Sequence, residues 1–150
     1  MATTVGTGDD LATLVKNFIL LERDAIAAYD SCIDRLEALH RKDKVSEFRA
    51  DHIRHLDDLI SLAGRVGAEA PAEGDMKQML TTGKIAMADL VGGDGAILKA
   101  MSTNETDTVS AYERGAGNAA IPAEHRGLFE RAHADEVRHK SWMDSEAQAA

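Results

Sequence analysis

Apolar residues recur along the chain at steps of three and four, which is the spacing of one face of an α-helix. From Leu11 to about Leu39 no Gly or Pro interrupts the chain. The apolar face of this stretch carries Leu11, Val15, Phe18, Ala25, Tyr29, Cys32 and Leu36. Asp9 and Asp10 precede it and are suited to the N-cap and the first helical turn. The pattern predicts a first helix over about 11–39.

A second apolar face follows a polar stretch. The sequence HRKDK at 40–44 predicts a turn, with Asp43 as a candidate cap. Steps of three and four then run through Val45, Phe48, His52, His55, Leu59, Leu62 and Val66. The glycines at 64 and 67 end the pattern. We therefore expect a second helix that forms a hairpin with the first.

The C-terminal half repeats this organisation. GGDG at 92–95 opens a helix whose face carries Leu98, Met101, Glu105, Thr108 and Tyr112. Gly115, Gly117 and Pro122 mark the next turn, and Pro122 suits the first position of a helix. The last helix carries Phe129, Ala132, Glu136, His139 and Met143. With residues 67–93 as a long crossover, the chain is predicted to be an all-α, ferritin-like four-helix bundle of two hairpins.

Two sequence blocks occur twice. ERDAIAAY at 22–29 is similar to ETDTVSAY at 105–112, and ADHIRH at 50–55 is similar to ADEVRH at 134–139. The offsets are 83 and 84 residues, so both blocks recur at nearly one distance. This indicates an internal duplication, which would relate the two hairpins by a pseudo-two-fold axis.

Composition narrows the class of protein. The 150 residues suit one domain, 1–150, with 1–8 as a flexible N-terminus. A net charge of −9 and 4% aromatic residues disfavour nucleic acid and anionic membranes as partners. No apolar run approaches a membrane span, and the polar N-terminus does not have the pattern of a secretory signal. With Cys32 the only cysteine, a reduced cytoplasmic location is the default expectation.

Ionisable residues interrupt the apolar faces of all four helices. Glu22 and Glu105 lie on the first and third helices, His52 and His55 on the second, and Glu136 and His139 on the fourth. An unpaired buried carboxylate costs several kcal/mol, and a shared cation would compensate that cost. Side chains at i and i+3 share one helix face, so Glu136 and His139 can reach one metal site together, as can His52 and His55. We therefore expect a metal site at the centre of the bundle.

At this point the sequence resembles the ferritin-like superfamily, the group of bacterioferritin, rubrerythrin and related di-iron proteins. The block Glu-x-x-Ala-Ile-x-x-Tyr at 22–29 is similar to the first-helix motif of bacterioferritins. Glu136-x-x-His139 matches the ligand pair of the family's second hairpin. GGDGAILKA at 92–100 and the third helix with its Tyr also resemble small bacterial ferritin-like domains.

The resemblance implies a ligand set and a function. Its metal ligands would be Glu22, His55, Glu105, Glu136 and His139, with Tyr29 and Tyr112 as nearby hydrogen-bonding residues. A binuclear iron centre would carry out ferroxidase chemistry or redox chemistry with O₂ or peroxide. The alternatives are the same site with zinc or manganese, and a non-enzymatic bundle that self-associates in a stress or scaffold role.

His52 differs from the family pattern, which has a bridging Glu at this position. A neutral imidazole has one free lone pair and cannot bridge two metals as a carboxylate does. The metal near Glu136, His139 and Glu105 is therefore expected to bind more tightly than the one near Glu22. The hairpin register leaves two arrangements open, because either Glu22 or Tyr29 could lie level with the two histidines.

Isoleucines lie outside the main apolar faces of the first two helices. Together with one leucine they are Ile19, Ile26, Ile33, Leu39, Ile53 and Ile60. Clustered exposed apolar residues are unusual on a monomer, so a homodimer or larger homo-oligomer is expected.

Overall fold

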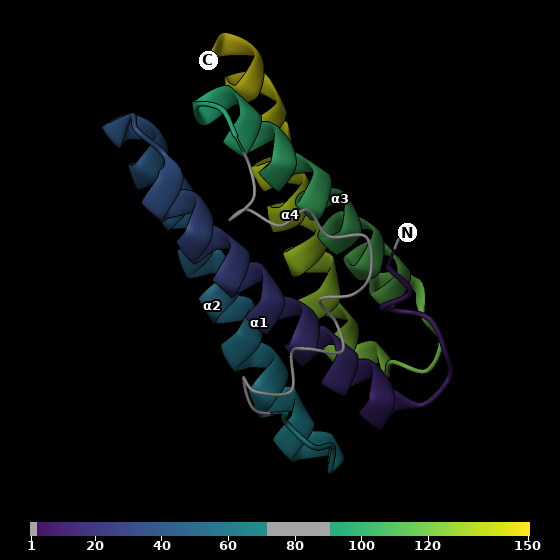
Figure 1. The fold of residues 1–150 in the computed structure, drawn as a ribbon. Coiled ribbons are helices and arrows are strands. Elements are labelled where there is room, and N and C mark those ends of the chain that lie inside the picture. Colours follow the sequence, from purple (N-terminus) through teal and green to yellow (C-terminus); the bar gives the residue numbers. More distant parts are fainter. Residues whose placement is uncertain (1–2, 72–90) are drawn as a thin grey trace.

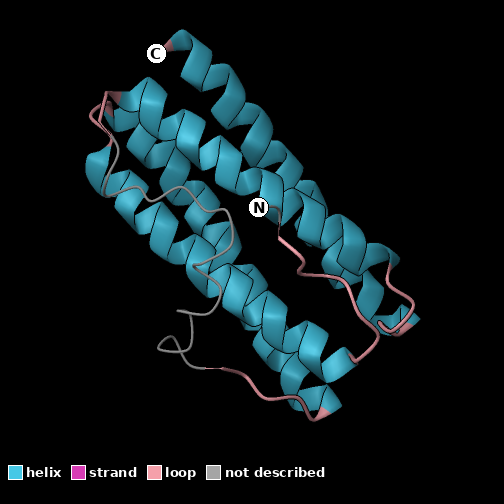
Figure 2. Ribbon diagram, turned by 45° about the vertical axis from the view of Figure 1, so that its right-hand side comes forward, coloured by secondary structure: helices cyan, strands magenta, loops and turns pink. Residues whose placement is uncertain are grey.

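The chain folds into four α-helices in a computed structural model that describes residues 3–71 and 91–150. The helices are α1 (Leu11–Arg35), α2 (Leu39–Val66), α3 (Asp94–Gly117) and α4 (Ala123–Ala149). Helix α1 packs mainly on α2, and α3 mainly on α4, as two hairpins lying side by side (Figures 1 and 2). Within these described ranges, the predicted all-α bundle of four helices is confirmed. Most of the crossover predicted for 67–93 lies outside the described residues.

The turn between α1 and α2 lies at residues 36–38, so the prediction of a turn at 40–44 is wrong. Residues 40–44 belong to the first turns of α2. The turn is fixed from a distant part of the chain by Asp94, the first residue of α3. Its carboxylate accepts hydrogen bonds from the backbone N–H groups of Glu37 (2.8 Å) and Ala38 (3.1 Å) and pairs with Arg41 at 3.0 Å.

We expect Asp94→Ala to lower the free energy of unfolding by about 2 kcal/mol, because two partly buried backbone N–H groups and Arg41 lose their charged acceptor. The same turn then loses its link to the second hairpin. Chemical denaturation of the metal-free protein measures the effect, and Asp43→Ala, an exposed acidic residue of α2, is the matched control. Equal stability of the two variants would show that Asp94 does not fix the turn.

The helix ends follow local sequence signals. Asp10 is the N-cap of α1, as predicted, and its side chain accepts a hydrogen bond from the Thr13 backbone N–H at 3.2 Å. Gly67 ends α2 with φ 71°, a left-handed conformation that glycine adopts without strain. Pro122 occupies the N-cap of α4, one residue before the position predicted for it.

The apolar core consists of two clusters that flank a polar layer. One contains Phe18, Leu59, Tyr112 and Phe129, and the other contains Tyr29, Cys32, Phe48, Leu98 and Met143. In every helix the ionisable residues singled out above lie, in sequence, between the residues of the two clusters. The polar layer therefore crosses the middle of the bundle and is enclosed by apolar side chains at both ends.

Ile19 is buried in the first cluster, so its assignment to an outer surface is wrong. Ile26 and Ile33 are partly buried against the core. Of the six residues expected on the outer faces, Leu39, which is 71% exposed, and Ile60 are exposed. Homo-oligomerisation stays a prediction.

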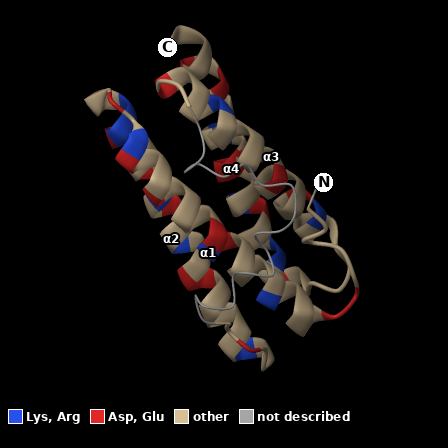
Figure 3. Ribbon diagram, in the orientation of Figure 1, with Lys and Arg blue, Asp and Glu red and all other residues tan. Residues whose placement is uncertain are grey.

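The N-terminal segment, predicted to be flexible, packs on α3 from Thr3 onward. Arg114 donates hydrogen bonds to the carbonyl oxygens of Val5 (3.1 Å) and Thr3 (2.9 Å), and Val5 is buried. Acidic and basic residues are interspersed along the helices (Figure 3). Among the described residues, none of the helices has an apolar stretch that could cross a bilayer.

Candidate metal centre

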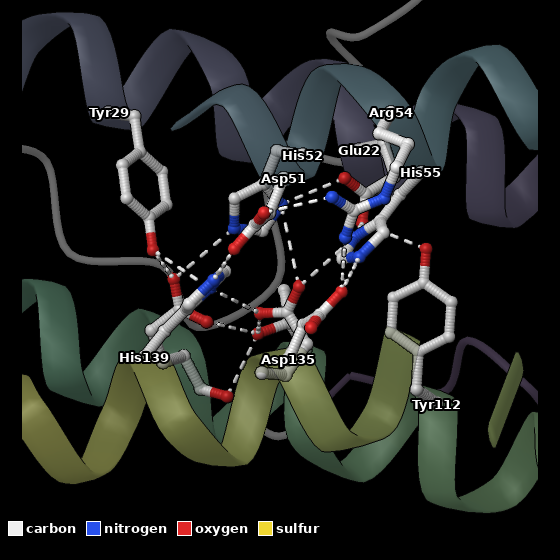
Figure 4. A network of polar contacts seen from close by, with 12 residues as sticks. Glu22, Tyr29, Asp51, His52, Arg54, His55, Tyr112, Asp135 and His139 are labelled. Atoms are coloured by element: carbon white, nitrogen blue, oxygen red, sulfur yellow. Dashed lines mark hydrogen bonds and ion pairs between the residues drawn. The ribbon is translucent and has the colours of Figure 1, made fainter. Parts of the chain in front are cut away.

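The structure brings together all six residues that the sequence singled out as metal ligands. Their exposed fractions are at most 4%, and each of the four helices contributes at least one of them. They are Glu22 from α1, His52 and His55 from α2, Glu105 from α3, and Glu136 and His139 from α4. Figure 4 shows the side chains of Glu22, His52, His55 and His139 converging between the two hairpins.

The six side chains form two overlapping groups that could each hold a metal ion. One group is Glu22, His52, His55 and Glu136, and the other is His52, Glu105, Glu136 and His139. Within each group, one ligand atom from every residue lies within 4.8 Å of the others. His52 and Glu136 belong to both groups, so they lie where two ions would meet.

The position of the first turn settles the register of the α1–α2 hairpin. His52 Nδ1 lies 2.8 Å from Glu22 Oε2, and His55 Nδ1 lies 3.5 Å from Glu22 Oε1. Glu22 is therefore level with both histidines. Tyr29 also reaches this layer, because its ring centroid lies 4.6 Å from that of His52. Of the two arrangements that the sequence left open, the one with Glu22 level with the histidines is therefore present, and the Tyr29 ring reaches the same layer.

Two tyrosines connect the hairpins across the centre. The Tyr29 hydroxyl of α1 donates to Glu105 of α3, and the Tyr112 hydroxyl of α3 donates to Glu22 of α1 at 2.8 Å. Burial, together with the charge of the neighbouring glutamate, raises the pKa of each tyrosine well above its usual value. Both hydroxyls therefore stay protonated and act as hydrogen-bond donors to the carboxylates.

Asp51 and Asp135 hold the histidines of the opposite helix. His139 Nε2 on α4 lies 2.8 Å from Asp51 Oδ2 on α2, and His55 Nε2 lies 2.8 Å from Asp135 Oδ2. Since each Nε2 is directed at an aspartate, the Nδ1 atoms face the centre, where a neutral ring presents its lone pair (Figure 4).

Arg54 and Arg138 complete this outer layer. Arg54 pairs with Asp51 at 3.0 Å and with Asp135 at 2.6 Å, while Arg138 pairs with the same two aspartates at 2.8 and 3.2 Å. Partial burial raises the pKa of Asp51, but hydrogen bonds from His139 and Arg138 outweigh this effect and lower the pKa to about 2. Both arginines went unnoticed in the sequence, although each lies within the duplicated block.

The contacts obey the pseudo-two-fold relation that the duplication predicted. Tyr29 and Tyr112 make equivalent bonds to Glu105 and Glu22, and the Asp51–His139 contact matches that of Asp135 with His55. Among the six ligand-type residues, the pattern breaks at one pair of positions, because His52 in the first half corresponds to Glu136 in the second. Within the ligand set, the difference in chemistry between the halves therefore lies in the two residues shared by both ligand groups.

Thr108 also contacts the centre, although the sequence analysis did not assign it to the site. Its hydroxyl lies 2.8 Å from Glu105 Oε2 and 2.9 Å from Glu136 Oε2. The repeat places Ala25 at the equivalent position of α1, so this contact occurs on one side only. Thr108 lies on the same face of α3 as Glu105, and this spacing could have indicated that it belongs to the site.

Opposite charges decide the protonation of the centre. Burial lowers the pKa of His55, because it disfavours the charged ring. The hydrogen bonds and negative charges of Glu136 and Glu22 outweigh burial and raise this pKa to about 10. The pKa of His52 is also raised, because the charges of Glu136 and Glu22 exceed the effect of burial. Burial and the charge of Glu136 raise the pKa of Glu105 to about 7. Protons on these groups therefore offset part of the buried negative charge.

Three buried atoms in the centre make no hydrogen bond within the described part of the chain. They are His52 Nε2, His55 Nδ1 and Glu136 Oε1. The nearest carboxylate oxygens lie 3.5 Å from His52 Nε2 and 3.4 Å from His55 Nδ1. Buried polar groups are almost always satisfied, so three such atoms in one layer indicate a missing partner. Imidazole nitrogen and carboxylate oxygen are donors that iron, zinc and manganese all accept in proteins.

We expect the double variant Asp51→Asn/Asp135→Asn to bind metal about 10–100-fold more weakly, because both histidines lose the charged partner that orients them. A competition titration against a chelator measures the affinity. Asp57→Asn, an exposed aspartate of α2, is the control and retains normal binding. Unchanged affinity in the double variant would show that the aspartates do not position the histidines for binding.

Comparison with known proteins does not add a family to this description. No protein-family model matches the chain, and a search of curated proteins finds no match either. The geometry of the site is therefore the basis on which a function can be inferred.

Proposed function

We propose that this protein binds two metal ions in its buried centre, with iron as the first candidate, and that the loaded centre reacts with O₂ or peroxide. The observation that supports the proposal is the convergence of three buried atoms without hydrogen bonds, His52 Nε2, His55 Nδ1 and Glu136 Oε1, among six ligand-type side chains. The resemblance to ferritin-like proteins favours iron over other metals.

The two ligand groups divide between the ions. Glu22 and His55 would hold one ion, Glu105 and His139 the other, and Glu136 lies within reach of both. His52 can give its lone pair to either group. Bound iron would supply electron exchange with O₂ or peroxide, and ferrous iron would itself be the substrate if the protein is a ferroxidase.

The chain's own residues maintain the conditions for this chemistry. The Tyr29 and Tyr112 hydroxyls donate hydrogen bonds to the carboxylates of Glu105 and Glu22, respectively, and thereby tie α1 to α3. The aspartates at 51 and 135 direct the histidine Nδ1 atoms inward. The apolar clusters on either side exclude bulk water, so charges within the layer interact more strongly than they would at the surface.

A second candidate is the same centre holding zinc or manganese. Three imidazoles make the donor set rich in nitrogen, which suits zinc as well as iron. The third reading, a metal-free bundle that acts by self-association, predicts no response to any of these ions.

Metal addition to chelator-treated protein tests metal binding directly. Fe(II) under anaerobic conditions, Mn(II) or Zn(II) should raise the melting temperature, because the ion binds the folded state only. A free-metal concentration about 1,000 times Kd contributes about 4 kcal/mol, which corresponds to a shift of about 10 °C for a domain of this size. Glu105→Gln should reduce the shift, while Glu130→Gln, an exposed glutamate of α4, should keep it. A melting temperature that no ion changes would favour the metal-free reading.

The redox part of the proposal has a separate readout. Fe(II) mixed with the protein should be oxidised by O₂ or peroxide faster than Fe(II) in buffer. A visible absorption band should develop during this oxidation. If the protein binds Fe(II) but oxidises it at the rate of buffer, metal binding stands and the redox function is wrong.

A further inference from the structure

An oxidant that reacts at the buried centre needs a way through the wall of the bundle. None of the six ligand-type residues is more than 4% exposed. Two cavities of the described structure have ligand-type residues in their walls, one between α1 and α3 and the other between α2 and α4. They approach the centre from different sides.

The cavity between α1 and α3 borders a carboxylate of the centre directly. Its walls include Glu105, Tyr29 and Thr108, and both hydroxyls contact the Glu105 carboxylate. Ala25, also in the wall, is partly exposed in the described part of the chain. The volume is about 30 Å³, which is room for a water-sized molecule. The cavity therefore leads from the surface of the bundle to a ligand-type residue.

The cavity between α2 and α4 ends in the outer layer instead. Its volume is about 300 Å³, and His55, Asp135 and Arg54 lie in its wall. His55 Nε2 lies 2.8 Å from Asp135 Oδ2, and Arg54 pairs with the same carboxylate at 2.6 Å. A molecule in this cavity therefore meets the paired side of His55, while the Nδ1 atom of that ring faces the centre.

The cavity between α1 and α3 occurs where the internal repeat is broken. At the offset of 83 residues, Phe18 of the first half corresponds to Met101 of the second. The Phe18 ring packs on Tyr112, with 4.9 Å between the ring centroids. Met101 lines the cavity beside Tyr29, the repeat equivalent of Tyr112. A narrow, flexible thioether thus replaces an aromatic ring on the Glu105 side of the centre.

Hydrogen peroxide matches the size and polarity of this cavity. It is neutral, so it enters a buried layer without the desolvation cost of a charged species. It is little larger than water, and it can donate hydrogen bonds to the Glu105 carboxylate and to the Thr108 hydroxyl oxygen in the wall. Dioxygen carries no hydrogen and cannot make these bonds.

We propose that hydrogen peroxide reaches the Glu105 side of the centre through the cavity between α1 and α3 and is the oxidant there. The route stands on the cavity alone, whereas the role as oxidant rests on the proposed function. In that role, one H₂O₂ takes two electrons from two ferrous ions and two protons from solvent, and it gives two water molecules.

Met101 provides a report of the route that needs no metal. Its thioether can take one oxygen atom from peroxide, so that the O–O bond breaks, an S–O bond forms and water leaves. Met101 and Met143 lie in the described helices and are both buried, at 1% and 0% exposed. Met101 lines the cavity and Met143 does not, so the two residues differ in their access to a molecule inside it.

Oxidation of the chelator-treated, full-length protein with dilute hydrogen peroxide tests the route. Met101 should form its sulfoxide about tenfold faster than Met143, because susceptibility follows access to the oxidant. Peptide mass spectrometry measures both rates. In urea the unfolded chain should oxidise both residues at one rate, which verifies that their intrinsic reactivity is equal.

Filling the cavity should remove the difference. Ala28, 7% exposed, lies in the wall, and Ala28→Leu should slow Met101 oxidation about tenfold, since a close-packed interior leaves no room for a second molecule. Ala27→Leu at an exposed neighbour and Ala134→Leu in the cavity between α2 and α4 should leave the Met101 rate unchanged. If Ala28→Leu fails to fold by circular dichroism, Ala25→Leu fills the partly exposed end of the same cavity.

Iron-loaded protein separates the route from the metal function. Ala28→Leu should slow peroxide-driven oxidation of bound Fe(II) about tenfold and leave the Fe(II) affinity unchanged within about twofold. Equal oxidation of Met101 and Met143, or slow Fe(II) oxidation in Ala134→Leu alone, would overturn the route while metal binding stands. Absence of metal binding would overturn the proposed function and the role of peroxide as oxidant, and Met101 would still show whether peroxide enters the cavity.

Discussion

Replacing Glu136 with alanine should abolish metal binding in both halves of the centre. Glu136 belongs to both ligand groups, and its Oε1 atom makes no hydrogen bond in the described structure. That atom lies 3.4 Å from His55 Nδ1 and 3.5 Å from His52 Nδ1. Because both ions would lose a charged ligand at once, we expect the metal affinity to fall by at least about 100-fold, which is about 2.8 kcal/mol of binding free energy.

A chelator-competition titration measures this loss, and circular dichroism verifies that the variant folds. Glu130→Ala removes an exposed carboxylate from the same helix and should bind as the unmodified protein does. Glu136→Gln preserves shape and should still bind far more weakly, because it lacks the charge. Two ions bound with normal affinity to Glu136→Ala would show that the shared carboxylate is not a ligand.

His52→Glu should strengthen the weaker of the two metal positions. His52 Nδ1 faces Glu22 at 2.8 Å and His52 Nε2 faces Glu105 at 3.5 Å, so its nitrogens are directed at different ligand groups. A neutral imidazole has one lone pair and serves only one group at a time. The three central glutamates also leave two divalent ions under-compensated by one charge, and a fourth carboxylate would balance them.

The unmodified protein is therefore expected to bind two ions with affinities that differ by at least about tenfold, which is about 1.4 kcal/mol. His52→Glu should raise the weaker affinity about tenfold and bring the two values closer together. His133→Glu makes the same substitution on α4 outside the ligand groups and should leave both affinities unchanged. Two equally tight sites in the unmodified protein, with no change in His52→Glu, would contradict this account of the substitution.

Helical periodicity predicted the buried faces well, because the spacing of apolar residues depends only on local geometry. The five buried residues of α4 are the same five that the pattern selected, and two of them are Glu136 and His139. The turn between α1 and α2 could not be placed in this way. Its backbone N–H groups donate to Asp94, which lies more than fifty residues away, and no sequence pattern marks Asp94 for that role.

The duplication was the most informative signal for the site. It selected residues in both halves at one offset, and the structure brings these residues into one layer. The contacts of Asp51 and Asp135 with histidines of the opposite helix were not predictable, because they depend on the distance between α2 and α4. Ile19 shows the same limit, since its burial depends on how the second hairpin packs against α1.

Anomalous scattering from crystals grown with saturating Fe(II) or Mn(II) tests the central claim most directly. The account predicts anomalous density inside the bundle, at ligand distances of about 2 Å from the carboxylates and from the inward-facing Nδ1 atoms of His55 and His139. The stronger of two peaks should be accompanied by a weaker one on the other side of Glu136. Six ordered side chains without anomalous density between them, in crystals whose surface carboxylates do bind the ion, would contradict it.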